Sequence, residues 1–206
     1  MNKFTKKILT LRQHLVGARY YNALAAMEFA AKYHTGLRKD GVTPEFDHQI
    51  SIALHALTLP DLMFREEVIA TIFLHDVRED YGITDIEIRN LFNEEKFAER
   101  VAQAVAHMTK EFRGVKCDEE KLFATMATDP IASIAKGCDR IHNFQSMVGV
   151  FTKTKQQSYI AECKALFFPM LKAARRNFPH QVMAYENIKH TLISQIELIE
   201  AMHEHM

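Results

Sequence analysis

The sequence contains few cysteines and no long apolar run. Its three cysteines are widely spaced and form no CxxC pair (Cys117, Cys138 and Cys163). An odd number of scattered cysteines does not indicate a disulfide framework and fits a reducing cytoplasm. No stretch approaches the roughly 18 apolar residues of a membrane span, and the apolar part of the basic N-terminal segment is too short for a signal peptide. We therefore expect a cytoplasmic protein without a membrane partner.

The sequence also has no excess of charge of either sign. Lys and Arg together number 26, as do Asp and Glu, so the formal net charge is zero. Domains that bind nucleic acids are usually basic, so we expect no nucleic-acid partner. An anionic ligand would have to be held by nearby cations, because the protein as a whole offers no attractive field.

Segments of alternating polar and apolar residues are scarce, whereas apolar residues recur at spacings of three and four along most of the chain. This pattern predicts an all-α fold. Over its 206 residues the chain shows no internal repeat and no linker-like segment. We therefore expect one domain, with the sequence motifs in a core over about residues 20–145 and a helical extension over about 150–206.

Helix boundaries follow from the same pattern and from capping signals. Thr84-Asp85-Ile86-Glu87 matches a capping box, and Asp129-Pro130 is typical of a helix start. Residues 34–48 are expected to form a loop that could include a small hairpin, and 110–116 a second loop. The expected helices cover about 10–33, 47–57, 64–81, a short segment from 84, 95–109, 118–127, 129–148, 154–177 and 179–203.

The last two of these helices are long. Their apolar residues recur at helical spacing and are expected to pack in the core or against a partner. We expect no ligand role for the histidines in this region (His180, His190, His203 and His205).

Four ionisable side chains follow directly after the apolar run 68–74: His75, Asp76, Glu79 and Asp80. In a continuing helix His75 and Glu79 are four residues apart, as are Asp76 and Asp80, so all four share one broad face. They could form an ordinary solvated helix end. Burying so many ionisable groups is costly unless something compensates them, and a divalent cation would do so.

Two further residues could complete a metal site. His48 follows the first loop, and Asp139 lies beside the apolar stripe of a later helix, with Asn143 four residues on. Taken singly, these could be a helix-start histidine and a salt-bridged aspartate. Combined with His75 and Asp76, they offer two imidazoles and two carboxylates. That mixed set suits a divalent ion such as Mn, Fe, Co or Mg and fits structural zinc less well, since no cysteine takes part.

The order His, His-Asp, Asp in a helical chain resembles the HD-type metal-dependent phosphohydrolases. Four segments make the chain similar, more narrowly, to the hydrolase domain of RelA/SpoT-type proteins, which removes the 3′-pyrophosphate from the guanosine alarmone (p)ppGpp. The chain is too short to include that family's synthetase domain, so it resembles the stand-alone small hydrolases. The four segments are His34-Thr35-Gly36-Leu37-Arg38-Lys39, Phe46-Asp47-His48, His75-Asp76-Val77-Arg78-Glu79-Asp80 and Asp139-Arg140-Ile141-His142-Asn143.

The resemblance implies specific roles. It implies a manganese ion, or another divalent ion, bound by four residues: His48, His75, Asp76 and Asp139. It implies that Glu79 and Asp80 act on water and on the leaving group, a role that carboxylates one helical turn past the metal ligands can perform. It implies that Arg38 and Lys39 contact the base and phosphates of a nucleotide, and that Asn143 orders the nucleotide or the groups around the metal. Arg140 is a further candidate cation for substrate binding, with Lys136 and Lys153 as weaker ones.

The sequence departs from the family pattern at three positions. Gln49 stands where proline commonly follows the metal-binding histidine, Asp47 stands where an apolar residue is usual, and Tyr81 stands where threonine is usual. The first two bear on the loop beside the base and hence on the identity of the nucleotide.

Two alternative functions therefore stay open: another nucleotide phosphohydrolase, such as an NADPH 2′-phosphatase or a nucleotidase, and a non-catalytic binding module. The paired acids Glu79 and Asp80 argue against the second, and the sequence does not indicate an oligomeric state.

Overall fold

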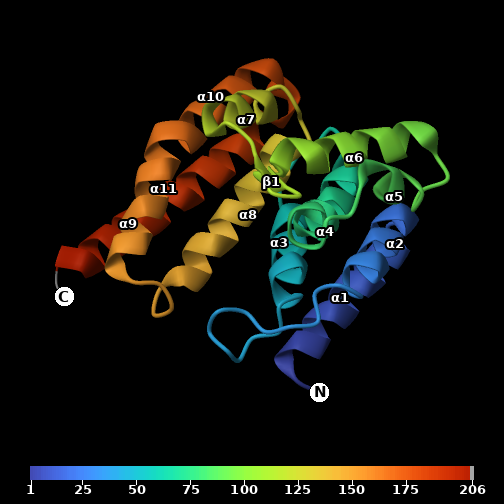
Figure 1. Ribbon diagram of the computed structural model, residues 1–206, viewed down its shortest axis with the longest axis horizontal. Coiled ribbons are helices and arrows are strands. Elements are labelled where there is room, and N and C mark those ends of the chain that lie inside the picture. The colour runs from blue at the N-terminus through green and yellow to red at the C-terminus, as the bar shows by residue number, and fades with distance from the viewer. Residues whose placement is uncertain (205–206) are drawn as a thin grey trace.

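The protein is a bundle of α-helices (Figure 1). The computed structural model describes residues 1–204, so His205 lies outside the described residues. The helices surround one continuous cluster of buried apolar side chains, which confirms the predicted helical fold. In chain order the first eight are α1 (Lys3–Gly17), α2 (Tyr21–Ala30), α3 (Asp47–Leu57), α4 (Arg65–Tyr81), α5 (Asp85–Arg89), α6 (Glu95–Met108), α7 (Glu119–Met126) and α8 (Ala132–Met147).

Helix α4 is the centre of the bundle and packs against α2, α3, α6 and α8. The apolar run 68–74 is buried along its whole length, which explains its continuous rather than alternating apolar pattern. The helix ends at Gly82, whose positive φ of 68° is accessible to glycine at little cost. The charged end of α4 therefore emerges from the core at a fixed place.

Helices α3 and α8 flank this end of α4, and the three pack against one another. Helix α3 begins and ends where the sequence predicts. Helix α8 begins at Ala132, later than predicted, although the Asp129 carboxylate accepts hydrogen bonds from the amides of Ile131 and Ala132 as a cap would. Figure 1 shows α8 between the C-terminal helices on one side and α3 and α4 on the other.

The prediction of one long helix over residues 10–33 is wrong. The chain breaks between α1 and α2, where Arg19 adopts a left-handed conformation with φ 61°. The apolar spacing continues across the break because both helices face the same core and also pack on each other. Periodicity alone could not distinguish this arrangement from one straight helix.

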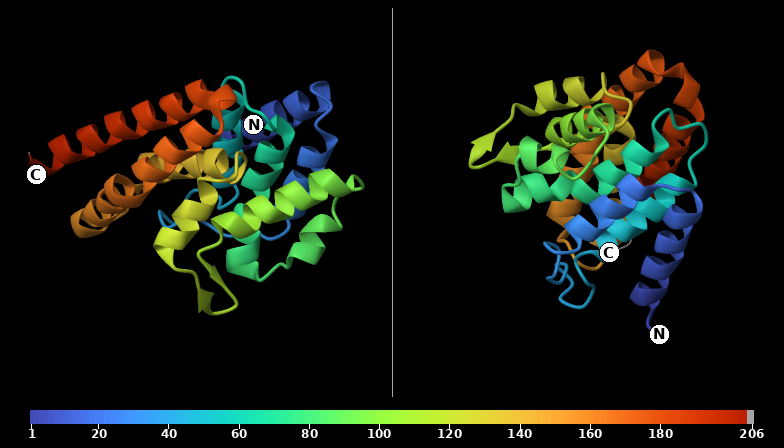
Figure 2. Two further views of the ribbon diagram at one scale, coloured as in Figure 1. Left: turned by 90° about the horizontal axis from the view of Figure 1, so that it is seen from above. Right: turned by 90° about the vertical axis from the view of Figure 1, so that its right-hand side faces the viewer.

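The prediction of a plain loop over residues 110–116 is also wrong. This segment forms an antiparallel hairpin of β1 (Glu111–Phe112) and β2 (Val115–Lys116) that projects from the helices in both views of Figure 2. Its two turn residues, Arg113 and Gly114, have positive φ, as tight hairpins require. The other predicted loop does contain the small antiparallel contact allowed for it, a bridge between Leu37 and Pro44.

The two long C-terminal helices are present, with one irregularity. The first consists of α9 (Lys153–Glu162), a π-helical turn (Cys163–Phe167) and α10 (Phe168–Asn177). The second consists of a short 3-10 turn (Pro179–Gln181) followed by α11 (Val182–Glu204). Pro169, at the start of α10, has no amide hydrogen to donate one turn back, and a widened turn directly before it accommodates that loss. Within residues 1–204 no helix has both the length and the apolar character needed to cross a lipid bilayer.

The contact between α8 and α11 generates a stability prediction. A Cβ added at Gly137 would lie 2.7 Å from Cδ1 and 2.9 Å from Cγ2 of the buried Ile188. We expect Gly137→Ala to lower the free energy of unfolding by about 1–3 kcal/mol in urea denaturation, because either the Ile188 side chain must repack or the two helices must move apart. Gly17→Ala is the control, since nothing lies within 4 Å of a Cβ there. Equal stability of Gly137→Ala and wild type would contradict the predicted close packing.

Candidate active site

Two histidines and an aspartate meet where α3 and α4 pack together. His48 lies in the first turn of α3, and His75 and Asp76 lie in the second half of α4. One potential ligand atom from each lies within 4.8 Å of the others. His75 Nε2 is 3.1 Å from Asp76 Oδ1, and His48 Nε2 is 3.9 Å from Asp76 Oδ2. This cluster could hold a metal ion.

Asp139 of α8 closes the cluster from a third side. Its Oδ1 is 3.2 Å from His48 Nε2 and 3.9 Å from His75 Nε2. Burial acts to raise the pKa of this carboxyl, but the Lys136 ammonium and the neighbouring imidazoles outweigh burial and hold the pKa well below its usual value. Asp139 is therefore ionised. The structure thus brings all four predicted metal ligands together.

The hydrogen bonds around His75 fit metal binding. His75 Nδ1 is 2.7 Å from the Ile72 carbonyl oxygen, so this nitrogen carries the hydrogen. The other ring nitrogen, Nε2, is buried and has no hydrogen-bond partner among residues 1–204. An imidazole held by a backbone carbonyl with its free nitrogen turned toward carboxylates is a typical metal ligand. The donor set of two nitrogens and two carboxylates suits a borderline divalent ion.

His142 supports His48 in a similar way. The Nδ1 atoms of the two rings are 2.9 Å apart, so one of them donates and the other accepts. Burial, followed by the neighbouring His48 and Arg38, lowers the pKa of His142 to about 3, which leaves it neutral and able to accept. A hydrogen on His48 Nδ1 leaves His48 Nε2 available to a cation. This role of His142 could not be predicted from the sequence, because the contact joins α8 to a residue far away in the chain.

Glu79 and Asp80 lie in the last turn of α4 and line a pocket of about 600 Å³ beside the cluster. The Glu79 carboxylate accepts a hydrogen bond of 2.8 Å from the Lys110 amide, at the base of the hairpin. Partial burial and then the charges of Asp76, Glu79 and Glu45 raise the pKa of Asp80 to about 6. Asp80 can therefore take up or release a proton close to neutral pH.

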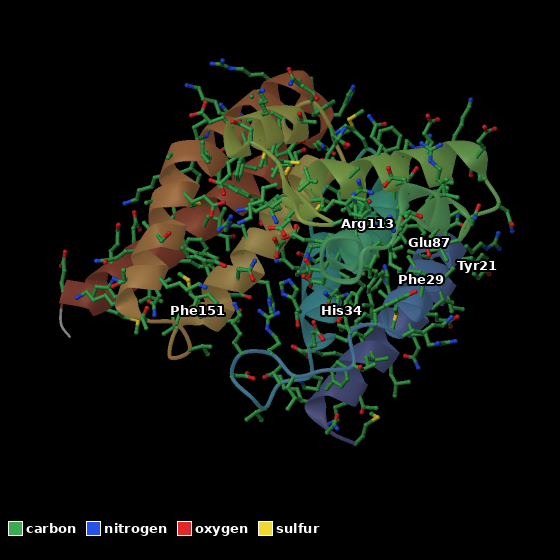
Figure 3. The ribbon with its side chains drawn as sticks, in the orientation of Figure 1. Tyr21, Phe29, His34, Glu87, Arg113 and Phe151 are labelled. Atoms are coloured by element: carbon green, nitrogen blue, oxygen red, sulfur yellow. The ribbon has the colours of Figure 1, made fainter. Side chains whose placement is uncertain are left out.

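Arg38 and Lys39 also line the pocket and lie on the loop before α3. Arg38 Nη2 lies 3.3 Å from the Ser146 hydroxyl, and Lys39 Nζ lies 5.1 Å from the centre of the Phe151 ring. Figure 3 shows Phe151 at the turn that follows α8. Neither cation is paired with a carboxylate in the described part of the chain, so both are available to an anionic ligand.

The other predicted cations are already paired. Lys136 donates to Asp139 Oδ2 at 2.9 Å, and the Asn143 side-chain amide donates to Asp139 Oδ1 at 2.7 Å. Lys153 does not line the pocket; its ammonium donates to the His203 carbonyl. The Lys136 ammonium thus neutralises the Asp139 carboxylate, and the Asn143 amide helps to orient it.

The C-terminal extension contributes to the pocket through Tyr159 and Glu162 of α9. The Glu162 carboxylate lies 3.0 Å from Arg140 Nη2 and 2.7 Å from Lys110 Nζ. The buried Arg140 guanidinium also lies over the Tyr159 ring, 5.1 Å from its centre. Neither residue was predicted from the sequence, because the two lie three apart on one helix face outside any recognised motif.

Comparison with known proteins identifies the family. Residues 26–177 match the model of the HD domain. The chain belongs to the HD-domain family. Within that family it is related to the hydrolase domain of RelA/SpoT-type proteins, as the sequence motifs indicate.

Three relatives illustrate this relationship. The chain is 29 % identical over 150 residues to guanosine-3′,5′-bis(diphosphate) 3′-pyrophosphohydrolase of Aquifex aeolicus, a match that covers 70 % of this chain and 20 % of that protein. It is 30 % identical over 152 residues to a probable guanosine-3′,5′-bis(diphosphate) 3′-pyrophosphohydrolase of Synechocystis, covering 69 % of this chain and 19 % of that protein. It is 26 % identical over 148 residues to the GTP pyrophosphokinase rsh of Brucella melitensis, covering 70 % of this chain and 19 % of that protein. The chain therefore spans about a fifth of the length of the relatives it matches.

Proposed function

We propose that this HD-domain protein is a manganese-dependent phosphohydrolase that removes the 3′-pyrophosphate from (p)ppGpp. One observation carries the proposal: a single pocket joins a candidate metal cluster, the adjacent acids Glu79 and Asp80, and two cations without a carboxylate partner among residues 1–204, Arg38 and Lys39. The names of the pyrophosphohydrolase relatives supply the substrate suggested for this arrangement.

Four residues would hold the divalent ion: His48, His75, Asp76 and Asp139. When bound, such an ion lowers the pKa of a water molecule and polarises a phosphoryl oxygen. The arrangement of donors supports this assignment, since all four groups face one another and His75 Nε2 has no other partner among residues 1–204. Acidic side chains also outnumber basic ones around the pocket, so an added cation is electrostatically favoured.

The two acids would manage the protons of hydrolysis. Water adds to the phosphorus next to the 3′-oxygen, the bond between that phosphorus and the 3′-oxygen breaks, and the leaving oxygen takes up a proton. Asp80, with its pKa of about 6, can accept the proton of the attacking water near neutral pH. Glu79, which the Lys110 amide holds in place, can orient the water or protonate the leaving oxygen.

The cations on the loop would bind the nucleotide. The planar guanidinium of Arg38 can stack on a purine, and the Lys39 ammonium can pair with phosphate. Arg140, whose charge is matched by Glu162, would act on the substrate only together with that carboxylate. Because Glu162 pairs with Arg140, the pocket offers fewer free cations to a substrate. A nucleotide with a single phosphomonoester, such as the 2′-phosphate of NADPH, needs fewer free cations than a pyrophosphate does. The pairing therefore favours such a nucleotide as the second candidate substrate.

The metal site can be tested by removing one ligand from each of two helices. Asp76→Ala and Asp139→Ala are each expected to lose bound manganese and activity, because the remaining donors cannot hold the ion tightly. Elemental analysis of protein loaded with Mn²⁺ and then desalted measures the bound metal. Wild-type metal content in both variants would refute the proposed ligand set.

The catalytic role of the two acids can be tested separately from metal binding. Replacing Glu79 and Asp80 together with Ala is expected to leave the manganese content unchanged and to lower kcat by a factor on the order of 10² or more, the range for general acid–base groups. Glu99→Ala is a control, because that exposed acid lies outside the pocket lining. Full activity of the double variant would exclude these carboxylates from the mechanism.

The substrate can be identified with a nucleotide panel in the presence of Mn²⁺. We expect release of pyrophosphate from (p)ppGpp, with GDP or GTP as the other product, and we expect Arg38→Ala mainly to raise KM because it removes a binding contact. The panel includes NADPH, nucleoside monophosphates and deoxynucleotides. Turnover of one of these without release of pyrophosphate from (p)ppGpp would replace the proposed substrate and leave the metal assignment intact.

A further inference from the structure

A chain of polar side chains runs from Asp76 to the rim of the pocket. Gln49 Nε2 donates to Asp76 Oδ2 at 3.1 Å and lies 3.4 Å from His34 Nε2. His34 Nδ1 lies 3.5 Å from Glu45 Oε1, and the Tyr81 hydroxyl lies within 3.5 Å of both oxygens of Glu45. Five residues from the first loop, α3 and α4 are thereby linked.

The inner part of this network is buried, which gives its hydrogen bonds a fixed direction. Gln49 is 1 % exposed and His34 is 3 % exposed. A flipped Gln49 amide would turn its oxygen toward the Asp76 carboxylate, so Nε2 must face Asp76, while the buried Oε1 has no partner among residues 1–204. The second hydrogen of Nε2 then points to His34 Nε2, which accepts it.

This direction continues through the imidazole ring. Because His34 Nε2 accepts, its Nδ1 carries the hydrogen. This nitrogen lies 3.5 Å from Glu45 Oε1, without the geometry of a hydrogen bond. Burial lowers the pKa of His34, in keeping with a neutral ring. The ring is also packed parallel to Phe46, with centres 6.2 Å apart, and meets the edge of Tyr81 at 5.3 Å. Figure 3 shows His34 at the start of the loop, beside the central helices.

The network meets the metal cluster at Asp76, whose carboxylate accepts a hydrogen bond from it. Its two oxygens have different partners: Oδ2 accepts from Gln49, whereas Oδ1 lies 3.1 Å from His75 Nε2. A carboxylate at the end of a short side chain can rotate, and a hydrogen bond to one oxygen fixes the direction of the other. Asp76 is also the most exposed of the four candidate ligands, with a third of its side chain accessible to solvent, so its packing alone constrains it least.

We propose that Gln49 is a positioning residue that orients Asp76 for the divalent cation, and that His34 acts on the metal site through Gln49. This inference rests on the metal site of the proposed function. At the outer end, the Glu45 carboxylate lies 3.5 Å from His34 Nδ1, a charge contact without hydrogen-bond geometry. Gly36 leaves room for that carboxylate, since a Cβ there would lie 3.2 Å from Glu45 Oε2.

The test is the Mn²⁺ affinity of Gln49→Met, which keeps the size of the side chain and removes its hydrogens. We expect binding about 10- to 100-fold weaker than in wild type by calorimetric titration, the usual effect of losing a group that orients a ligand. Thermal unfolding in EDTA measures the stability of the metal-free fold. Gln181→Met is the matched control: this buried amide donates to the Pro130 carbonyl and the Tyr185 hydroxyl, so its loss should lower stability and leave Mn²⁺ affinity unchanged.

His34→Phe provides a second, independent variant. It keeps an aromatic ring against Phe46 and Tyr81 and removes the acceptor for Gln49. We expect weaker Mn²⁺ binding from this change in the wild-type background and a smaller effect in the Gln49→Met background, because coupled residues are not additive. This variant also tests the inference if Gln49→Met does not fold.

The outcomes separate the two proposals. Wild-type Mn²⁺ affinity in both Gln49→Met and His34→Phe would overturn this inference and leave the metal site standing. Fully additive effects would overturn the claim that His34 acts through Gln49. Failure of the wild-type protein itself to bind Mn²⁺ would overturn the metal site of the proposed function and this inference with it.

Discussion

A carboxylate buried among three helices, that of Asp139, sets the geometry of the site. Removing an ionised group from water is costly unless opposite charge and hydrogen-bond donors replace the water. Lys136 and Asn143 from its own helix supply part of this compensation, and His48 and His75 from α3 and α4 approach it from the other side. The same interactions that compensate the Asp139 carboxylate therefore hold α3, α4 and α8 together and bring the candidate ligands to one place.

The sequence predicted most of what depends on local spacing. Helix α3 was predicted with its observed ends, and the capping box at Thr84 is present. The four candidate ligands lie on three helices far apart in the sequence, and their convergence was predicted from the resemblance of their order to the HD-type phosphohydrolases. The roles assigned to Glu79, Asp80, Arg38 and Lys39 stay predictions, although all four residues line one pocket.

Features that depend on contacts between distant segments, and that no motif marks, could not be predicted. The break at Arg19 interrupts an apolar pattern that both flanking helices continue, because they face the same core. The hairpin over residues 111–116 is too short to show alternation, and the stacking of Phe112 on Arg78, 4.0 Å from ring centre to guanidinium, stabilises it. Two of the three departures from the family pattern, Gln49 and Tyr81, lie in one network through His34, whereas Asp47 pairs with Lys7 of α1.

The surplus of acidic side chains around the pocket has a thermodynamic consequence. In the proposed function a cation and a polyanion share this pocket. The cation offsets the acidic charge that opposes binding of the polyanion, and the polyanion adds negative charge that attracts the cation. The two binding equilibria are then linked, and the factor by which the metal tightens nucleotide binding equals the factor by which the nucleotide tightens metal binding. The metal affinity of this protein would accordingly be a property of the ternary complex, highest when the nucleotide is present and lower after product leaves.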